Sequence, residues 1–202
     1  MDMHPEPGIR HLTYDQLVAS TADHECPGIG KDHTCVKIGA VADLPTKFGT
    51  FHIVGFWNDR DGKDHVAIVK GDPFGKSDVP VRLHSECLTG DALGSLRCDC
   101  RDQLTSALEA IDREETGMVL YLRQEGRGIG LLNKLRAYGL QDEGLDTVDA
   151  NIALGFRDDE RDYSVAAHML ALLQVKSVKL MTNNPKNVEG LRELGVDVSG
   201  RI

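Results

Sequence analysis

Apolar and polar positions alternate along the first half of the chain, which is typical of half-buried strands. Residues 41–54 predict a strand, a turn at Pro45 and a second strand. Asp61-Gly62 predicts a hairpin turn between strands at 51–57 and 65–70. We therefore expect mostly antiparallel strands in this half.

Residues 79–86 form the clearest alternating stretch. The apolar side chains share one face of the predicted strand, so the opposite, open face carries three polar side chains in a row: Arg82, His84 and Glu86. This strand leads directly into a cysteine-rich segment.

The period of the pattern changes to that of helices in the second half. Apolar residues at 104, 107, 108 and 111 predict a helix with one buried face, and residues 118–122 predict a buried strand. Gly195 stands where a glycine commonly ends a helix. Strands first and alternating helices and strands later predict an α+β, or mixed α/β, fold in a single domain. The remaining elements are expected at 131–140, 147–154, 162–173, 177–182 (a strand) and 186–194.

The first 35 residues differ in composition from the rest of the chain. They hold several Pro and Gly residues and four of the eight histidines, and an apolar cluster at 14–19 predicts one or two helical turns. We expect residues 1–35 to form a poorly ordered extension and residues 36–202 to form the folded domain.

Charge and hydropathy narrow the classes of function. The formal net charge of −9 argues against a general nucleic-acid-binding protein, which needs a basic surface. No apolar run approaches the roughly 20 residues that span a membrane, and the first ten residues lack the pattern of a signal peptide. We therefore expect a cytoplasmic protein with neither a nucleic-acid nor a membrane partner.

Cys87, Cys98 and Cys100 are the strongest chemical signal in the chain. Three thiolates on a loop after a strand can hold a zinc ion, and cysteines of a cytosolic chain bind metal or do chemistry more often than they form disulfides. Three interpretations stay open: a catalytic zinc with water as fourth ligand, a closed structural zinc site completed by Cys26 or Cys35, and buried cysteines without metal.

Three further stretches carry weaker signals. The glycine-rich loop at 124–130, with Arg127, is either a phosphate-binding loop or a plain connection between a strand and a helix. The charged run at 158–163 is either a helix start or a ligand site, and the polar stretch at 182–185 is either a loop or a site at a strand end. Helical spacing alone places Tyr138 in the core.

Taken together, these motifs resemble the GTP cyclohydrolase II family, which catalyses the first step of riboflavin biosynthesis. The matching stretches occur in the family's order and cover roughly residues 41–198. They are Arg-Leu-His-Ser-Glu-Cys-Leu-Thr-Gly-Asp (82–91), Ser-Leu-Arg-Cys-Asp-Cys (95–100), Tyr-Leu-Arg-Gln-Glu-Gly-Arg-Gly-Ile-Gly-Leu (121–131), Lys-Leu-Arg-Ala-Tyr (134–138), Leu-Gln-Asp-Glu-Gly-Leu-Asp-Thr-Val (140–148), Leu-Gly-Phe-Arg-Asp-Asp-Glu-Arg-Asp-Tyr (154–163) and Thr-Asn-Asn-Pro-Lys (182–186).

The resemblance implies an enzyme that hydrolyses GTP to 2,5-diamino-6-ribosylamino-4(3H)-pyrimidinone 5′-phosphate, formate and pyrophosphate, with residues 36–202 as its catalytic domain. It also implies one Zn²⁺ per chain, held by the three cysteines and a water, Mg²⁺ on the triphosphate, and a homodimer. Two alternatives stay open. One is a related enzyme that stops at a formamide product or uses another purine nucleotide, and the other is a non-catalytic protein that binds zinc or a nucleotide.

The resemblance also implies roles for single residues. Tyr138 matches the family's active-site tyrosine, which replaces the core interpretation, and Asp159 matches the proton acceptor. Arg161 matches the proposed nucleophile on the α-phosphate. Because a guanidinium stays protonated and has no free lone pair, we expect Arg161 to act instead as a charge clamp on the departing pyrophosphate.

Further positions match the family's substrate-binding residues. A carboxylate that accepts from guanine N1 and N2 would reject adenine, and Glu86 and Glu125 are both candidates for it. The matched positions are Arg82, Leu83, His84, Ser85, Glu86, Gln103, Glu125, Gly126, Arg127, Thr147, Thr182 and Asn187.

Two positions depart from the family's pattern. Asn187 stands where a second lysine would follow Lys186, so one expected phosphate contact is missing. Arg101 stands where a glycine is frequent and adds bulk beside the cysteine segment. Because the match begins near residue 41, too little chain precedes it for the dihydroxybutanone-phosphate synthase domain of bifunctional relatives, and we expect the monofunctional form.

Overall fold

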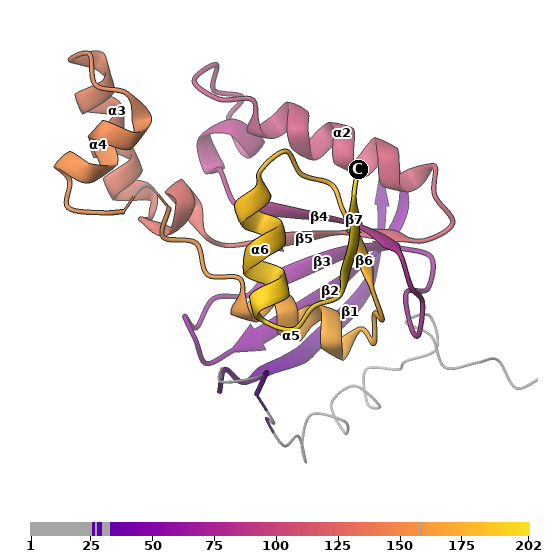
Figure 1. The fold of residues 1–202 in the computed structure, drawn as a ribbon. Coiled ribbons are helices and arrows are strands. Elements are labelled where there is room, and N and C mark those ends of the chain that lie inside the picture. Colours follow the sequence, from indigo (N-terminus) through magenta and orange to yellow (C-terminus); the bar gives the residue numbers. More distant parts are fainter. Residues whose placement is uncertain (1–25, 27, 30–32, 158) are drawn as a thin grey trace, which may run out of the picture.

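A computed structural model of the protein describes residues 26, 28–29, 33–157 and 159–202. Seven strands form one sheet in the spatial order β1-β2-β3-β5-β4-β6-β7 (Figure 1). With its helices, this sheet confirms the predicted mixed α/β fold in a single domain, while the predicted helical turns at 14–19 lie outside the described residues. The strands are β1 (Val36–Thr46), β2 (Gly49–Asn58), β3 (His65–Lys70), β4 (Val79–Ser85), β5 (Gly117–Leu122), β6 (Val178–Leu180) and β7 (Val198–Arg201).

The sheet has an antiparallel half and a parallel half. β1 pairs with β2, β2 with β3 and β3 with β5 in antiparallel fashion, as the alternating pattern predicts. β5 pairs with β4, β4 with β6 and β6 with β7 in parallel fashion, which requires longer crossovers that contain helices. Because β4, β5 and β6 run in the same direction, the segments after their carboxyl ends leave the sheet at one edge.

Helices cover both faces of the sheet (Figure 1). α2 (Cys100–Asp112) packs on one face, and α5 (Ser164–Leu172) and α6 (Pro185–Glu193) pack on the other. Successive residues of β5 point to opposite faces, so Val119 packs against α2 whereas Leu120 joins the main core with α5. The buried side chains of α2 are the ones that the helical period predicts: Ala107, Leu108 and Ile111.

Pro45 lies within β1, opposite Thr50 of β2, so the prediction of a turn at Pro45 is wrong. The turn comes at residues 47–48, where Thr46 Oγ1 accepts a hydrogen bond from Phe48 N at 3.1 Å. β1 is an edge strand of the sheet. A proline is tolerated there because its missing N–H can lie on the side that has no partner strand.

At the C-terminal end of the chain, the predicted end of the last helix is confirmed, but a final strand was not predicted. Gly195, with a φ of 82°, follows α6, and its N–H donates to Arg192 O at 2.9 Å, which confirms the predicted helix end. The sequence pattern missed β7, which at four residues is too short to show alternation.

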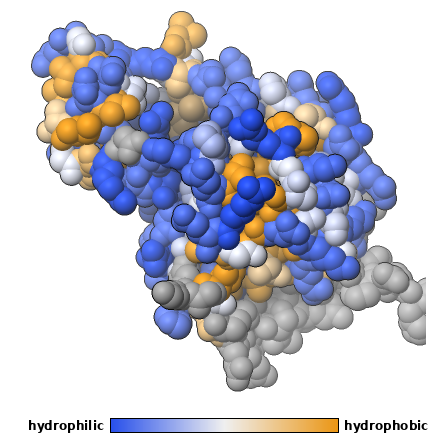
Figure 2. All heavy atoms as spheres, in the orientation of Figure 1, coloured by the Kyte–Doolittle hydropathy of each residue, from blue (hydrophilic) through white to orange (hydrophobic). Residues whose placement is uncertain are grey.

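α3 (Leu131–Asp142) and α4 (Thr147–Ala153) lie side by side and project away from the sheet (Figure 1); we call this pair the α3–α4 arm. α3 also contacts the short helix η3 (Glu125–Gly128). Figure 2 shows hydrophobic side chains gathered on this arm. Its exposed apolar residues are Leu132, Leu135, Val148 and Ile152. Within the part of the chain that the structure describes, we find no helix with the length and apolar character needed to cross a membrane.

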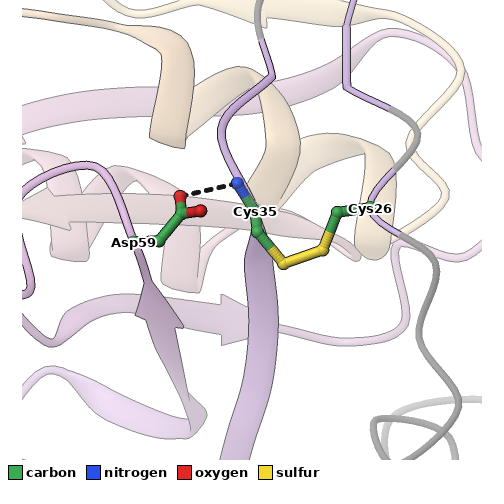
Figure 3. The surroundings of a disulfide bond; sticks show 3 residues. All are labelled: Cys26, Cys35 and Asp59. Atoms are coloured by element: carbon green, nitrogen blue, oxygen red, sulfur yellow. Dashed lines mark hydrogen bonds between the residues drawn. A yellow bond between two sulfur atoms is a disulfide. The ribbon is translucent and has the colours of Figure 1, made fainter.

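Cys26 and Cys35 form a disulfide next to the start of β1 (Figure 3). The backbone N–H of Cys35 donates to Asp59 Oδ1 at 2.8 Å, beside the β2–β3 turn. Gly28, with a φ of 69°, allows the chain to turn back between the two cysteines. The expectation that the cysteines bind metal or react rather than form disulfides is therefore wrong for this pair.

Candidate active site

The segments that follow β4, β5 and β6 lie at the carboxyl edge of the parallel strands. β4 leads into the cysteine segment 86–100, β5 into the glycine-rich loop 123–130 and β6 into residues 182–184. A fourth segment, 159–163, packs against the glycine-rich loop through a backbone hydrogen bond of 3.0 Å from Glu160 N to a loop carbonyl. The fold thus gathers the stretches that the sequence singled out.

The Sγ atoms of Cys87, Cys98 and Cys100 all lie within 4.8 Å of one another. A Cβ at Gly90 would come within 2.7 Å of Cys98 Sγ, so this position requires glycine. Zinc binds thiolates at about 2.3 Å with tetrahedral geometry, and the three sulfur atoms are close enough together to fit it. A closed site completed by Cys26 or Cys35 is excluded, because these two cysteines are bonded to each other.

Lys134 and Glu125 form a buried ion pair beside the cysteines. Lys134 Nζ lies 2.7 Å from Glu125 Oε1 and 3.0 Å from Cys87 Sγ. Burial would raise the pKa of the Cys87 thiol, but hydrogen bonds, first that from Lys134, outweigh it and lower this pKa. Glu125 Oε2 accepts from Leu88 N at 2.7 Å, so this carboxylate ties the glycine-rich loop to the cysteine segment.

A carboxylate that sequence reasoning did not single out, Asp91, supports the cysteine segment from within. Its Oδ2 accepts from Cys87 N at 3.0 Å and from the Tyr121 hydroxyl at 2.8 Å, and its Oδ1 lies 3.0 Å from His84 Nε2. His84 is 3% exposed. The predicted open polar face of β4 is therefore closed at this point, because the segment after Cys87 folds back over it.

Arg101 stabilises the cysteine segment. Its guanidinium donates to Asp91 O at 3.2 Å and to Ala92 O at 2.8 Å. These carbonyls belong to the π-helical turn η2 (Leu88–Ala92). The arginine that stands in place of a frequent glycine therefore acts as a cap on this turn.

Tyr138 lies on α3 and contacts the cysteine segment. Its hydroxyl is 3.2 Å from Thr89 Oγ1, and the guanidinium of Arg97 lies 4.8 Å from its ring centroid. The core position that helical spacing indicates is wrong, because the arm projects away from the sheet and the neighbouring Leu135 is 46% exposed. A hydroxyl in this place can bind a water or a substrate atom beside the thiols.

The glycine-rich loop is built from residues with positive φ. Gly126, Arg127 and Gly128 have φ values of 64°, 58° and 95°. Glycine adopts such values freely, whereas arginine does so at a cost in backbone free energy. A Cβ at Gly128 would approach Glu160 O to 2.7 Å, so glycine is needed where the loop meets segment 159–163.

Asp159 and Arg161 form a partly buried ion pair. Arg161 Nε lies 2.8 Å from Asp159 Oδ1, and the backbone N–H of Arg161 donates to the same oxygen at 3.0 Å. Burial would raise the pKa of Asp159, but hydrogen bonds from Arg161 outweigh it and lower this pKa. Burial would likewise lower the pKa of Arg161, but the hydrogen bond to Asp159 and nearby negative charge raise it. Both groups therefore stay ionised.

A cavity of about 460 Å³ opens beside Arg161. Its walls come from the β2–β3 hairpin, from residues 157 and 159–164, and from α6 with the residue that follows it. Both basic and acidic side chains line it, and its three arginines are held by carboxylates in the pairs Arg60–Asp162, Arg157–Glu160 and Arg161–Asp159.

Arg82 and Gln103 lie together, whereas Thr147 lies elsewhere. Arg82 Nη2 donates to Gln103 Oε1 at 2.7 Å and Nη1 donates to Met181 O at 2.9 Å, so Arg82 links β4 to α2 and to the end of β6. Thr147 begins α4, and its Oγ1 accepts from Gln141 of α3 at 3.1 Å. It is therefore part of the projecting arm (Figure 1).

The remaining matched positions differ in exposure. Leu83 packs in the main core, and Ser85 ends β4. Thr182 and Asn187 are buried and bonded to each other, with Asn187 Nδ2 donating to Thr182 Oγ1 at 3.0 Å. Asn187 Oδ1 also accepts from the Tyr163 hydroxyl at 2.8 Å. The amide of Asn187 therefore fixes α6 to the loop after β6.

Comparisons with known proteins point to one family. A profile of the GTP cyclohydrolase II family matches residues 37–202. The GTP cyclohydrolase-2 of Aeromonas hydrophila is 58% identical over 167 residues, which cover 83% of this chain and 85% of that protein. The GTP cyclohydrolase-2 of Picrophilus torridus is 56% identical over 167 residues, which cover 83% of this chain and 86% of that protein.

A longer relative matches as well. The riboflavin biosynthesis protein RibBA of Bacillus mycoides is 51% identical over 194 residues, which cover 96% of this chain and 47% of that protein. The chain thus spans about half the length of this relative. The chain belongs to the GTP cyclohydrolase II family and is an enzyme of this kind, as the sequence motifs indicate.

Proposed function

We propose that the protein hydrolyses GTP to 2,5-diamino-6-ribosylamino-4(3H)-pyrimidinone 5′-phosphate, formate and pyrophosphate, the first step of riboflavin biosynthesis. This reaction opens the imidazole ring of guanine and cleaves a phosphoanhydride bond. One observation carries the proposal: the three-cysteine cluster lies in the segment after β4, and the Asp159–Arg161 pair lies in a segment that is hydrogen-bonded to the glycine-rich loop after β5. Each supplies the chemistry that one of the two hydrolyses needs.

The three cysteines Cys87, Cys98 and Cys100 are proposed to hold one zinc ion, with a water as fourth ligand. When bound, zinc lowers the pKa of water and so supplies the nucleophile for opening the ring at C8. Lys134 Nζ and Gly90 N donate to Cys87 Sγ at 3.0 and 3.3 Å, which offsets part of the negative charge of three thiolates.

Arg161 and Arg127 are proposed to bind the triphosphate, together with Mg²⁺ on its oxygens. Because Arg161 stays protonated beside Asp159, it has no lone pair with which to attack phosphorus. Its role is to stabilise the charge that develops on the departing pyrophosphate. Asp159 has a lowered pKa and is a weak base, so its contacts support a role in orienting Arg161.

Glu86 is proposed to select guanine. Only guanine offers donors at both N1 and N2 to a carboxylate. Of the two candidate carboxylates, Glu125 is buried and engaged by Leu88 N and Lys134 Nζ. The side chain of Glu86 is 25% exposed and lies 3.7 Å from Arg123, so it has room for a base.

Two copies of the chain are proposed to associate through the α3–α4 arm. Leu132 and Ile152 are 70% and 58% exposed on it, and a second copy would remove them from water. A cytoplasmic location fits the proposed substrate, a nucleoside triphosphate.

Tyr138→Phe is expected to leave GTP affinity within a factor of about two and to lower kcat by roughly 100-fold, because one orienting hydroxyl is lost beside the thiols. Formate release measures turnover, and binding of a non-hydrolysable GTP analogue measures affinity. An equal loss of both, with a lower Tm, would mark the residue as structural.

Cys26→Ser with Cys35→Ser is expected to leave zinc content and kcat unchanged, because this disulfide lies apart from the three-cysteine cluster. Loss of a disulfide that closes so short a loop lowers the free energy of unfolding by about 2–3 kcal/mol. The Tm of the double variant should therefore lie below that of the wild-type protein when both are measured without reductant. Metal analysis and thermal unfolding check this. A loss of zinc in the double variant would place these cysteines in the metal site.

Product analysis separates the proposal from its nearest rival, an enzyme that stops at the formamide or uses another purine nucleotide. Asn187 motivates that rival, because the resemblance implies a lysine at this position, whereas the amide of Asn187 is bonded inside the fold. We expect zinc-loaded protein with Mg²⁺ to convert GTP, but not ATP, to the deformylated diaminopyrimidine. Accumulation of a formamide, or turnover of ATP, would contradict the proposal.

A further inference from the structure

The β2–β3 hairpin contacts two of the segments that form the candidate site. Lys63 Nζ donates to Arg123 O at 3.1 Å, and Arg123 N donates to His65 Nδ1 at 3.0 Å. Arg60 Nε and Nη2 both donate to Asp162 Oδ2, at 2.9 and 2.5 Å. Arg123 opens the glycine-rich loop, and Asp162 directly follows Arg161. The hairpin, which lies outside the matched motifs, therefore stabilises both segments through hydrogen bonds.

The hairpin is itself fixed by a buried polar network. Asn58 is fully buried, and its Oδ1 accepts from Arg60 N at 2.8 Å and from Asp61 N at 3.0 Å. Asp61 Oδ1 accepts from Lys63 N at 3.0 Å and lies 3.2 Å from Nε2 of the fully buried His65. The backbone that carries Arg60 is thus held in one conformation.

Asp162 connects this hairpin to the rest of the site. Besides the bonds from Arg60, its Oδ1 accepts from Ser164 N at the start of α5 at 2.8 Å. Its carbonyl accepts from Gln124 Nε2 at 2.6 Å, which joins it to the glycine-rich loop. The residue after Arg161 is therefore anchored in three directions, and one of the anchors comes from a residue 102 positions away.

We propose that Arg60 is a positioning residue for Arg161: by holding Asp162, it fixes the segment from which Arg161 reaches the triphosphate. The inference rests on the proposed function for the reaction that Arg161 serves. The alternative is that Arg60 contacts the substrate directly, because Arg60 also lines the cavity and its side chain is 50% exposed.

A double-mutant cycle with Arg60→Gln, Asp162→Asn and the combined variant tests the inference. Residues that act through one contact are coupled, so each single change should lower kcat for pyrophosphate release by about 10-fold and the combined change should cost no more. KM for GTP, zinc content and Tm should stay close to wild type, and Arg60→Lys should recover part of the rate. Independent losses that multiply, or a raised KM with an unchanged kcat, would overturn the inference and indicate direct substrate contact.

Arg157→Gln is the matched control. Arg157 lines the same cavity but pairs with Glu160, so its loss removes the same charge without releasing Asp162. We expect this variant to lose less kcat than Arg60→Gln does, because Asp162 keeps its bonds from Arg60. A loss equal to that of Arg60→Gln would show a general effect of cavity charge and overturn the inference.

Hydrogen exchange of the free protein separates this inference from the proposed function. Arg60→Gln should speed amide exchange across residues 159–164 and leave α2 unchanged, whatever the substrate is. Unchanged exchange in 159–164 would overturn the positioning role. Failure of the wild-type protein to release pyrophosphate from GTP, with the exchange effect present, would instead reject the proposed function alone.

Discussion

Cys98→Ser is expected to abolish zinc binding and formate release together. The three sulfur atoms lie within 4.8 Å of one another, and no second cluster of potential ligands lies among the described residues to replace a lost thiolate. A hydroxyl is a poor zinc ligand beside two thiolates. Removing a metal that supplies about 4 kcal/mol of transition-state stabilisation slows turnover by roughly 1,000-fold.

Metal content and formate release are measured on the same preparation. Cys26→Ser with Cys35→Ser serves as the control for loss of cysteines outside the cluster, because these two residues are bonded to each other. We expect zinc to fall from about one per chain to near zero in Cys98→Ser and to stay near one in the control. Full activity of metal-stripped Cys98→Ser would disprove a catalytic role for zinc.

Arg161→Gln is expected to lower the rate of pyrophosphate release by roughly 1,000-fold, the scale of removing a charged donor from a phosphoryl-transfer site. Its guanidinium is oriented by Asp159 and remains protonated. Arg161→Lys keeps the charge but loses the planar fork, so it should recover only part of the rate. Binding of a GTP analogue should weaken much less than the rate falls.

Arg113→Gln is the matched control for Arg161, because Arg113 lies at the C-terminal end of α2, before β5 begins at the opposite edge of the sheet. It should retain wild-type kinetics. Isolation of a covalent nucleotide on Arg161 from the wild-type enzyme would contradict the charge-clamp role and support nucleophilic attack.

Local sequence signals predicted most of the fold. The alternation at 79–86 and the helical period of α2 marked faces that are buried as expected, because both reflect contact with one core. The prediction of a turn at Pro45 was wrong because a strand can contain a proline when it lies at the edge of a sheet. Only the complete sheet shows that β1 is an edge strand.

The sequence indicated some residues of the candidate site but not those that act through contacts with residues distant in the sequence. The three cysteines lie close together in the sequence, and this spacing alone indicates a metal site, so they can be predicted without knowledge of the fold. Asp91 and Lys134 act through contacts with Tyr121 and Cys87 that are 30 and 47 positions away. Arg60 reaches Asp162 across 102 positions. No local pattern encodes such contacts, because they exist only once the sheet is assembled.

The central claim is that one site carries out both hydrolyses of GTP, and the ratio of released products tests it most directly. Zinc-loaded protein would be incubated with GTP and Mg²⁺, and formate and pyrophosphate would be followed together, before and after removal and return of zinc. We predict equal amounts of both products, with formate release lost on zinc removal and restored on its return. Pyrophosphate without formate from the zinc-loaded enzyme, or formate release that survives complete zinc removal, would contradict the account.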